Sequence, residues 1–119
     1  MDSRIWVRGR VQSDPVTMDG TGIQVAAFVV ENEQTAPGKK GQRTARAVPW
    51  CDVICDGELA SNVLDSLVEG DYVVVEGELR VHRLYPVDDG RDSAMVSVRA
   101  ESVGLDLRRG VAKFLRMKR

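Results

Sequence analysis

One stretch, residues 50–60, constrains the fold more than any other, because it predicts a strand that runs directly into a helix. Its residue types alternate, and Trp50 and Ile54 share one side with two aspartates. The residues on the other side are Cys51, Val53 and Cys55. Because successive strand side chains point to opposite faces, the pattern predicts one buried face and one presented face. Gly57 then turns the chain into the helix.

The helix is predicted by apolar residues that recur at helical spacing after Gly57. These residues are Leu59, Val63, Leu64 and Leu67. We expect Gly70 to end the helix, since it follows the last apolar residue of the stripe. Beside this corner, Trp50 lies on the presented side of the strand, where it indicates a binding surface. Burial under a loop or at a subunit contact is the alternative for this tryptophan.

Alternating patterns predict four more strands, which we place at residues 4–12, 23–32, 72–81 and 93–103. Gly77, inside one of them, indicates a bend or bulge of the kind that barrels need. Five strands with a helix after the third predict an all-β fold, a five-stranded OB-fold β-barrel with one helix between strands 3 and 4. We expect residues 1–103 to form this domain, followed by a short C-terminal segment, residues 104–119.

The C-terminal segment combines apolar and basic residues. Its apolar residues are Leu107, Val111, Phe114 and Leu115, a pattern that predicts either a short amphipathic helix or a docked extended segment. Residues 107–119 also hold six of the 17 basic side chains and none of the 18 acidic ones. A basic end on an acidic body indicates a polyanion or an acidic protein as partner. A simply solvated end of the chain is the alternative.

A second group of basic residues falls between strands 2 and 3. Residues 35–46 hold Lys39, Lys40, Arg43 and Arg46 among proline and glycine residues, which predicts a loop. Such a loop either solvates its own charges or closes on a phosphate backbone, and the residues alone leave both interpretations open.

Several classes of function are disfavoured. The sequence has no run of about 20 apolar residues that could span a membrane, and its start lacks a signal-peptide pattern, so we expect a cytoplasmic protein. Cys51 and Cys55 lie too far apart on one strand to form a disulfide, and His82 is the only histidine, so no metal site is expected. We find no motif for an enzyme, a cofactor or a small-molecule substrate. Asp52 and Asp56 would lie roughly 13 Å apart on a strand, too far for joint acid-base catalysis.

Five motifs in order along the chain resemble one known family. They are Gly9 to Pro15, Trp50 through Gly57-x-Leu59-Ala60, Val68 to Arg80, Gly90-Arg91 and Val96 to Ala100. Together they cover residues 4–103 and resemble the bacterial single-stranded DNA-binding protein family. Residues 103–113 are similar to a segment of its actinobacterial branch that is regarded as a clamp between subunits. The chain ends without the family's acidic, phenylalanine-tipped tail, so we expect an auxiliary paralogue or a chain shortened at its end.

The resemblance implies a homotetramer, or a dimer as the alternative, that wraps single-stranded DNA in replication, recombination and repair. The family's four stacking aromatic positions correspond to Trp50, Asp56, Leu84 and a position near Ala36. Trp50 is therefore the one clearly kept, and Tyr85, next to Leu84, is a second candidate.

We expect single-stranded DNA to be contacted by a set of aromatic, apolar and basic residues. They are Trp50, Ile54, Arg8, Arg10, Lys39, Lys40, Arg43, Arg46, Arg80, Arg83, Tyr85 and Arg91. The basic members would contact phosphates, which supplies affinity without reading sequence. Trp6, Tyr72 and Val74 are expected at contacts between subunits, with a place in the core as the alternative for Trp6. Such a protein is expected in the cytoplasm, associated with the nucleoid.

A second hypothesis is an OB-fold protein-interaction module, a primosomal-type accessory protein with weak or no binding of single-stranded DNA. The acidic body of the chain and the missing stacking aromatics favour it. Binding of a single-stranded oligonucleotide at low salt discriminates between the two hypotheses.

Overall fold

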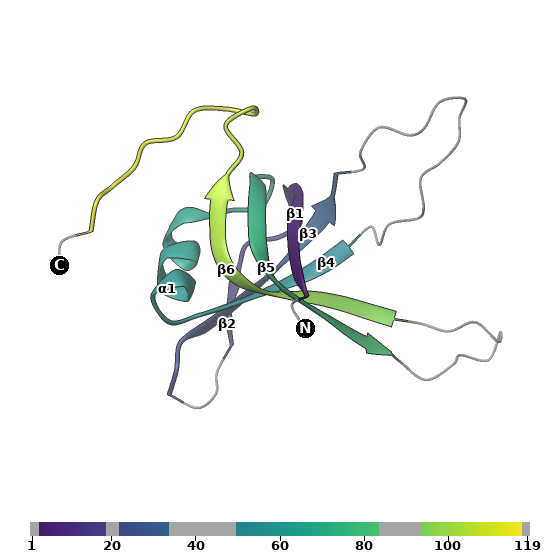
Figure 1. The fold of residues 1–119 in the computed structure, drawn as a ribbon. Coiled ribbons are helices and arrows are strands. Elements are labelled where there is room, and N and C mark those ends of the chain that lie inside the picture. Colours follow the sequence, from purple (N-terminus) through teal and green to yellow (C-terminus); the bar gives the residue numbers. More distant parts are fainter. Residues whose placement is uncertain (1–2, 19–21, 34–49, 84–93, 118–119) are drawn as a thin grey trace, which may run out of the picture.

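A sheet of β-strands closed into a barrel, with one helix packed against it, makes up the computed structural model (Figure 1). The structure describes residues 3–18, 22–33, 50–83 and 94–117. Along the chain the elements are β1 (Arg4–Val11), β2 (Val16–Met18), β3 (Val25–Asn32), β4 (Trp50–Asp56), α1 (Gly57–Ser66), β5 (Tyr72–Arg83) and β6 (Ala94–Leu105).

Pairing between β1 and β3 closes the barrel. The strand order is β1-β5-β6-β4-β3, and β3 pairs back to β1 with Val30 opposite Val11. Neighbouring strands are antiparallel except β4 and β6, which run parallel with Val53 opposite Val98. Five strands in this order, with α1 between the third and fourth strands of the barrel, form an OB-fold. The predicted fold class is therefore confirmed.

The structure contains one short strand that the sequence analysis did not predict. Strand β1 pairs with the last residues of β3, and β2 pairs with the first ones, with Val16 opposite Ala27 and Met18 opposite Val25. Strand β2 has only three residues, all of them exposed, so it is too short for an alternating pattern to predict it. As a result, the sheet continues past the start of β3 by one short strand that was not predicted.

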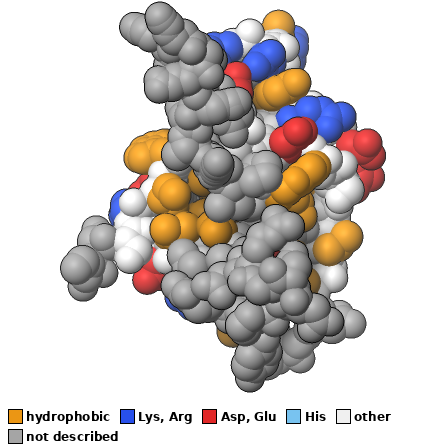
Figure 2. Space-filling model, turned by 90° about the vertical axis from the view of Figure 1, so that its right-hand side faces the viewer, with side chains coloured by type: hydrophobic (Ala, Val, Ile, Leu, Met, Phe, Trp, Pro, Cys, Tyr) orange, Lys and Arg blue, Asp and Glu red, His pale blue; other side chains and the backbone are white. Residues whose placement is uncertain are grey.

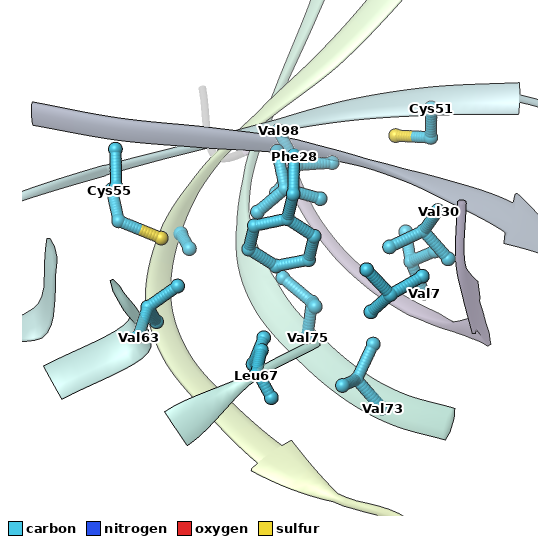
Figure 3. Packing of buried hydrophobic residues seen from close by; sticks show 14 of the residues in the cluster. Val7, Phe28, Val30, Cys51, Cys55, Val63, Leu67, Val73, Val75 and Val98 are labelled. Carbon is cyan, nitrogen blue, oxygen red and sulfur yellow. The ribbon is translucent and has the colours of Figure 1, made fainter. Parts of the chain in front are cut away.

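Small branched side chains fill the inside of the barrel. Figure 3 shows Phe28 near the middle of this cluster, with Val7, Val75 and Val98 close to it. The valines with no exposed surface are Val11, Val30, Val53, Val73, Val75 and Val98. Burying one such side chain stabilises a fold by about 1.5–3 kcal/mol. The predicted inward face of β4 is confirmed, because Cys51, Val53 and Cys55 are all buried.

Helix α1 packs its apolar stripe on the barrel, with Ala60 and Val63 buried. Its first residue, Gly57, has a φ of 66°, a left-handed conformation that glycine adopts without a steric penalty. The Gly57 N–H donates a hydrogen bond to the Gln24 carbonyl at 3.0 Å, which ties the corner to the start of β3. No helix in the described part of the chain is long and apolar enough to cross a membrane.

The end of α1 differs from the prediction. The helix ends at Ser66, and Leu67 follows in an extended conformation. Gly70, with a φ of 95°, lies in the turn that leads to β5. The Val68 N–H donates to the Asp71 carboxylate at 2.9 Å and stabilises this turn. The predicted role of Gly70 as the end of the helix was wrong, because the polar turn and not the helix requires the positive φ.

Gly77 marks a close contact between two backbones. The register of β5 and β6 shifts between Glu76 and Gly77, as the sequence predicts for a bulge. A Cβ atom at Gly77 would lie 2.2 Å from the carbonyl oxygen of Arg99, far inside van der Waals contact. The strong bend of these long strands therefore requires a residue without a side chain.

The chain after β6 forms no helix between residues 106 and 117. Strand β6 runs to Leu105, which still pairs with Val73, so the strand is longer than predicted. The following residues extend away from the barrel (Figure 1). Val111 is 93% exposed and Phe114 81%. Of the two predicted forms, the helix was wrong; residues 111–117 are extended and exposed, whereas the turn at Arg108 and Arg109 contacts the barrel.

We predict that Gly77→Ala lowers the free energy of unfolding by about 1–3 kcal/mol, because the added methyl group overpacks the β5–β6 contact. Urea denaturation at one fixed protein concentration measures this change. Gly104→Ala is the matched control, since nothing lies within 4 Å of a Cβ at Gly104, and its effect should stay within about 0.5 kcal/mol. Equal unfolding midpoints for both variants would contradict the proposed packing constraint.

Candidate nucleic-acid interface

The outer faces of β3 and β4 form a surface that is apolar in its middle. Trp50 and Ile54 point outward from β4, as the alternation predicts, and 49% of Trp50 is exposed. Burial of Trp50 inside this barrel is thereby excluded. Ile54 lies opposite Ala27, and Trp50 lies opposite Glu31, so both neighbours come from β3.

Two shallow hollows lie on this surface, one on each side of Ile54. The first, which we call the aspartate hollow, has a volume of about 250 Å³ and is lined by Ser13, Asp14, Val16, Met18, Ala27, Phe28, Val29, Asp52 and Ile54. The second, the arginine hollow, has a volume of about 210 Å³ and is lined by Ile54, Arg80, Ser97 and Arg99. Figure 2 shows that hydrophobic side chains on the side of the molecule nearest the start of β4 are interspersed with both basic and acidic ones.

Strand registers bring these residues together from distant parts of the sequence. Asp52 lies opposite Ser97 on β6, and Ser97 lies opposite Arg80 on β5. Ile54 lies opposite Arg99 in the next row. Four strands, β3, β4, β5 and β6, therefore contribute to one continuous outer surface.

A third row extends this surface to β1. Arg10 lies opposite Glu31, and Glu31 lies opposite Trp50. The Gln12 amide donates to Glu31 at 2.7 Å and orients its carboxylate. Arg10 and Trp50 therefore lie in the same row, with Glu31 of β3 between them. A predicted DNA contact and the predicted stacking residue are thus on the same surface.

The arginines of the arginine hollow are paired with carboxylates. Arg99 lies 3.0 Å from Asp56, and Arg80 lies 3.3 Å from Glu78. All four side chains are about half exposed, and exposed ion pairs contribute only about 0–1 kcal/mol. A phosphate can therefore replace either carboxylate at low cost.

Arg8 belongs to a different group of charges, which we call the Glu33 cluster. Glu33 lies 3.6 Å from Arg8, 3.1 Å from Arg108 and 2.8 Å from Arg109. Arg108 also pairs with Asp106 at 2.8 Å. The hydrogen bonds from the Arg108 side chain and N–H lower the pKa of Asp106 to about 2, so this pairing is lost only as the pH falls toward that value.

The Glu33 cluster joins the turn after β6 to the end of β3. The Arg109 guanidinium lies over the Tyr72 ring, 4.2 Å from its centroid, a cation–π contact. Tyr72, a predicted subunit contact, is therefore partly covered by its own chain. Trp6, the second predicted contact, is 68% exposed, so the core alternative for Trp6 is wrong. Val74 lies opposite Arg8 on the outer face of β5.

The two cysteines lie behind the surface, inside the barrel. Both thiols are free and buried. Burial, with a smaller contribution from Asp52, raises the pKa of Cys51 to about 11. Burial and the neighbouring Asp56 do the same for Cys55. Both thiols are therefore protonated at neutral pH and act as core side chains. The described residues contain no group of three side chains that could hold a metal ion.

Part of the predicted contact set lies outside the described residues. These residues are Lys39, Lys40, Arg43, Arg46, Tyr85 and Arg91. The backbone of Arg83 belongs to β5. Of the remaining residues, the structure brings Trp50, Ile54, Arg10 and Arg80 onto one surface.

Arg99 was not among the predicted DNA contacts. The alternating pattern of β6 places the Arg99 side chain on the outward side. Only the parallel register of β4 and β6 brings it opposite Ile54.

Three comparisons with known proteins concern almost the whole chain. The model of the single-strand binding protein family matches residues 2–106. "Single-stranded DNA-binding protein 1" of Streptomyces coelicolor is 30% identical over an alignment of 119 positions that covers 99% of this chain and 75% of that protein. The single-stranded DNA-binding protein of Mycobacterium tuberculosis is 29% identical over an alignment of 120 positions that covers 94% of this chain and 69% of that protein.

Two solved structures have the same fold. The crystal structure of a small single-stranded DNA-binding protein from Streptomyces coelicolor has a TM-score of 0.72 and 29% identity, covering 92% of this chain and 99% of that one. The second single-stranded DNA-binding protein of Mycobacterium smegmatis has a TM-score of 0.73 and 27% identity, covering 99% and 100%.

Proposed function

This chain belongs to the single-strand binding protein family, and we propose that it binds single-stranded DNA with little sequence preference, in DNA replication, recombination and repair. The observation that carries the proposal is the half-exposed indole of Trp50 on the outer face of β4, beside the two hollows. Aromatic side chains bind bases of any sequence because every base has a π face. We place this function in the cytoplasm, on the DNA of the nucleoid, where buried free thiols such as Cys51 stay reduced.

In this proposal the strand of DNA crosses β3, β4 and β6. A base stacks on Trp50, its neighbours lie along the aliphatic surface around Ile54, and Arg80 and Arg99 bind phosphates. Arg10 reaches the backbone next to the stacked base. The basic residues between β3 and β4 and those after β5 would add further phosphate contacts. Because each phosphate contact releases a counterion, affinity should fall steeply as salt rises.

The same face also carries features that favour the second hypothesis, a protein-interaction module with weak or no DNA binding. Glu31, Asp52, Asp56 and Glu78 place negative charge among the arginines. A basic partner protein would find complementary carboxylates here, whereas a phosphate backbone is repelled by them. Fluorescence anisotropy with a labelled thymidine oligomer at low salt separates the hypotheses, since an absence of binding would leave only the interaction module.

We also propose that the chain assembles as a homotetramer built from dimers, with a plain dimer as the alternative. Trp6 lies exposed on β1, opposite Glu76 on β5, and a large exposed apolar residue on a strand favours a protein contact. The C-terminal segment offers further unpaired apolar surface at Val111 and Phe114. We propose that this segment clamps a neighbouring subunit.

Trp50→Ala is expected to lower the affinity for a thymidine oligomer by about 1–3 kcal/mol, the contribution of one stacked base. Trp50→Phe is the matched control, because phenylalanine keeps a ring for stacking and should retain most of the affinity. Anisotropy titration of a labelled oligomer measures all three proteins under one salt condition. Unchanged affinity in Trp50→Ala would show that this indole has only a structural role.

If the protein assembles as proposed, its mass in solution at micromolar concentration should exceed that of a monomer. Light scattering of the full chain should give a tetramer. Replacing both Phe114 and Leu115 by aspartate should shift the mass toward dimer or monomer, because the clamp loses its apolar contacts. Lys113→Ala, in the same segment, is the control and should leave the mass unchanged. A monomeric mass for the unmodified chain would refute this assembly.

A further inference from the structure

Asp52 is an unpaired carboxylate in the middle of the proposed DNA-binding face. It points outward from β4, is partly buried and lines the aspartate hollow. Among the described residues, no side chain or backbone N–H donates a hydrogen bond to the Asp52 carboxylate or forms an ion pair with it, and the Cys51 thiol reaches only the backbone carbonyl of Asp52. Asp56 by contrast pairs with Arg99, and Glu78 pairs with Arg80. Asp14, the other acidic residue of the hollow, accepts a hydrogen bond from the Glu69 N–H at 2.8 Å. Asp52 therefore differs from its acidic neighbours in having a free acceptor.

The position of Asp52 conflicts with phosphate binding. A partly buried negative charge repels a phosphate backbone, and it gains no compensating partner from the protein. The conflict disappears if the group that faces Asp52 is a base edge and the phosphates lie elsewhere. The phosphates can lie instead at Arg80 and Arg99, on the other side of Ile54.

We propose that Asp52 accepts hydrogen bonds from an unpaired base that carries an exocyclic amino group, and that guanine is the preferred base in the aspartate hollow. This inference rests on the proposed binding of single-stranded DNA and specifies one subsite of the same face.

The chemistry of the bases selects guanine. An ionised carboxylate only accepts hydrogen bonds, and its two oxygens can accept two parallel ones. Guanine presents two such donors side by side on its Watson–Crick edge, the N1–H and the 2-amino group. Cytosine and adenine each present one amino group on that edge. Thymine has no amino group, and its single N–H lies between two carbonyl oxygens that a carboxylate repels.

The walls of the hollow are suited to a base. Val16, Ala27, Val29 and Ile54 line it with aliphatic surface, which can pack against the flat faces of a ring. A mostly apolar hollow with a few polar groups at its side is the usual form of a site that orients a small planar ligand. Trp50 lies two residues from Asp52 on the same side of β4, so about 7 Å separates them along the strand. One base can therefore stack on the indole while the next one occupies the hollow.

One OB-fold barrel occupies at most about 16 nucleotides. The test therefore uses thymidine oligomers longer than this. One oligomer contains only thymidine, one contains a few isolated guanines, and one has hypoxanthine in place of each guanine. Hypoxanthine lacks only the 2-amino group. We expect the guanine oligomer to bind about fivefold more tightly than plain thymidine, near the lower end of the value for a bidentate base contact. Most of that gain should disappear with hypoxanthine.

Asp52→Asn provides the decisive comparison. Removing the charge should tighten binding of plain thymidine, because repulsion of the backbone is relieved, and it should abolish the guanine preference. Tighter binding by the variant would also show that it is folded. Asp65→Asn, on the exposed side of α1, is the matched control; it changes the net charge equally and should retain the guanine preference.

The outcomes separate this inference from the proposed function. Absence of binding to every oligomer at low salt would overturn the proposed function itself. Binding of all three oligomers with equal affinity would overturn the inference about Asp52 and leave the function intact. A guanine preference that persists in Asp52→Asn would also overturn it, since the preference would then come from another residue.

Discussion

Strand β4 must serve two purposes with one alternation of side chains, and the rest of the structure depends on it. Its inward residues Cys51, Val53 and Cys55 have almost no exposed surface and complete the core. Its outward residues Trp50, Asp52 and Ile54 form the middle of the proposed binding face. A shift by one residue would exchange the two sets. The buried thiols and valine therefore fix the orientation of the indole and of Asp52 on the surface.

The closure of the barrel adds the charged residues to this face. Pairing of β1 with β3 brings Arg10 next to Glu31 and Trp50, and pairing of β6 with both β4 and β5 places Arg99 and Arg80 on the other side of Ile54. Each of these arginines lies near a carboxylate. The face can therefore bind a polyanion only by exchanging weak exposed ion pairs for phosphate contacts, which limits affinity and favours a strong dependence on salt.

The sequence was sufficient for features that depend on local pattern. The two faces of β4, the bulge at Gly77 and the helix that follows Gly57 come from alternation, helical spacing or a single residue type. The barrel fold was also predicted, but individual contacts that depend on the pairing of distant strands were not. The Glu33 cluster joins Glu33 to Arg108, 75 positions away in the sequence, and the place of Arg99 depends on a parallel register. Strand β2 has only three residues and no buried side chain, which is too short a run for a periodic pattern to be recognised.

The central claim is that unpaired DNA lies on the outer face of β3 and β4, with a base on Trp50. Photo-crosslinking with an oligomer that carries 5-iodouracil tests it most directly, because this base reacts with an aromatic side chain on which it stacks. The chain has two tryptophans, and they lie on different strands, Trp50 on β4 and Trp6 on β1. We expect the cross-linked peptide, identified by mass spectrometry, to contain Trp50. Cross-linking at Trp6 without any at Trp50 would contradict this account.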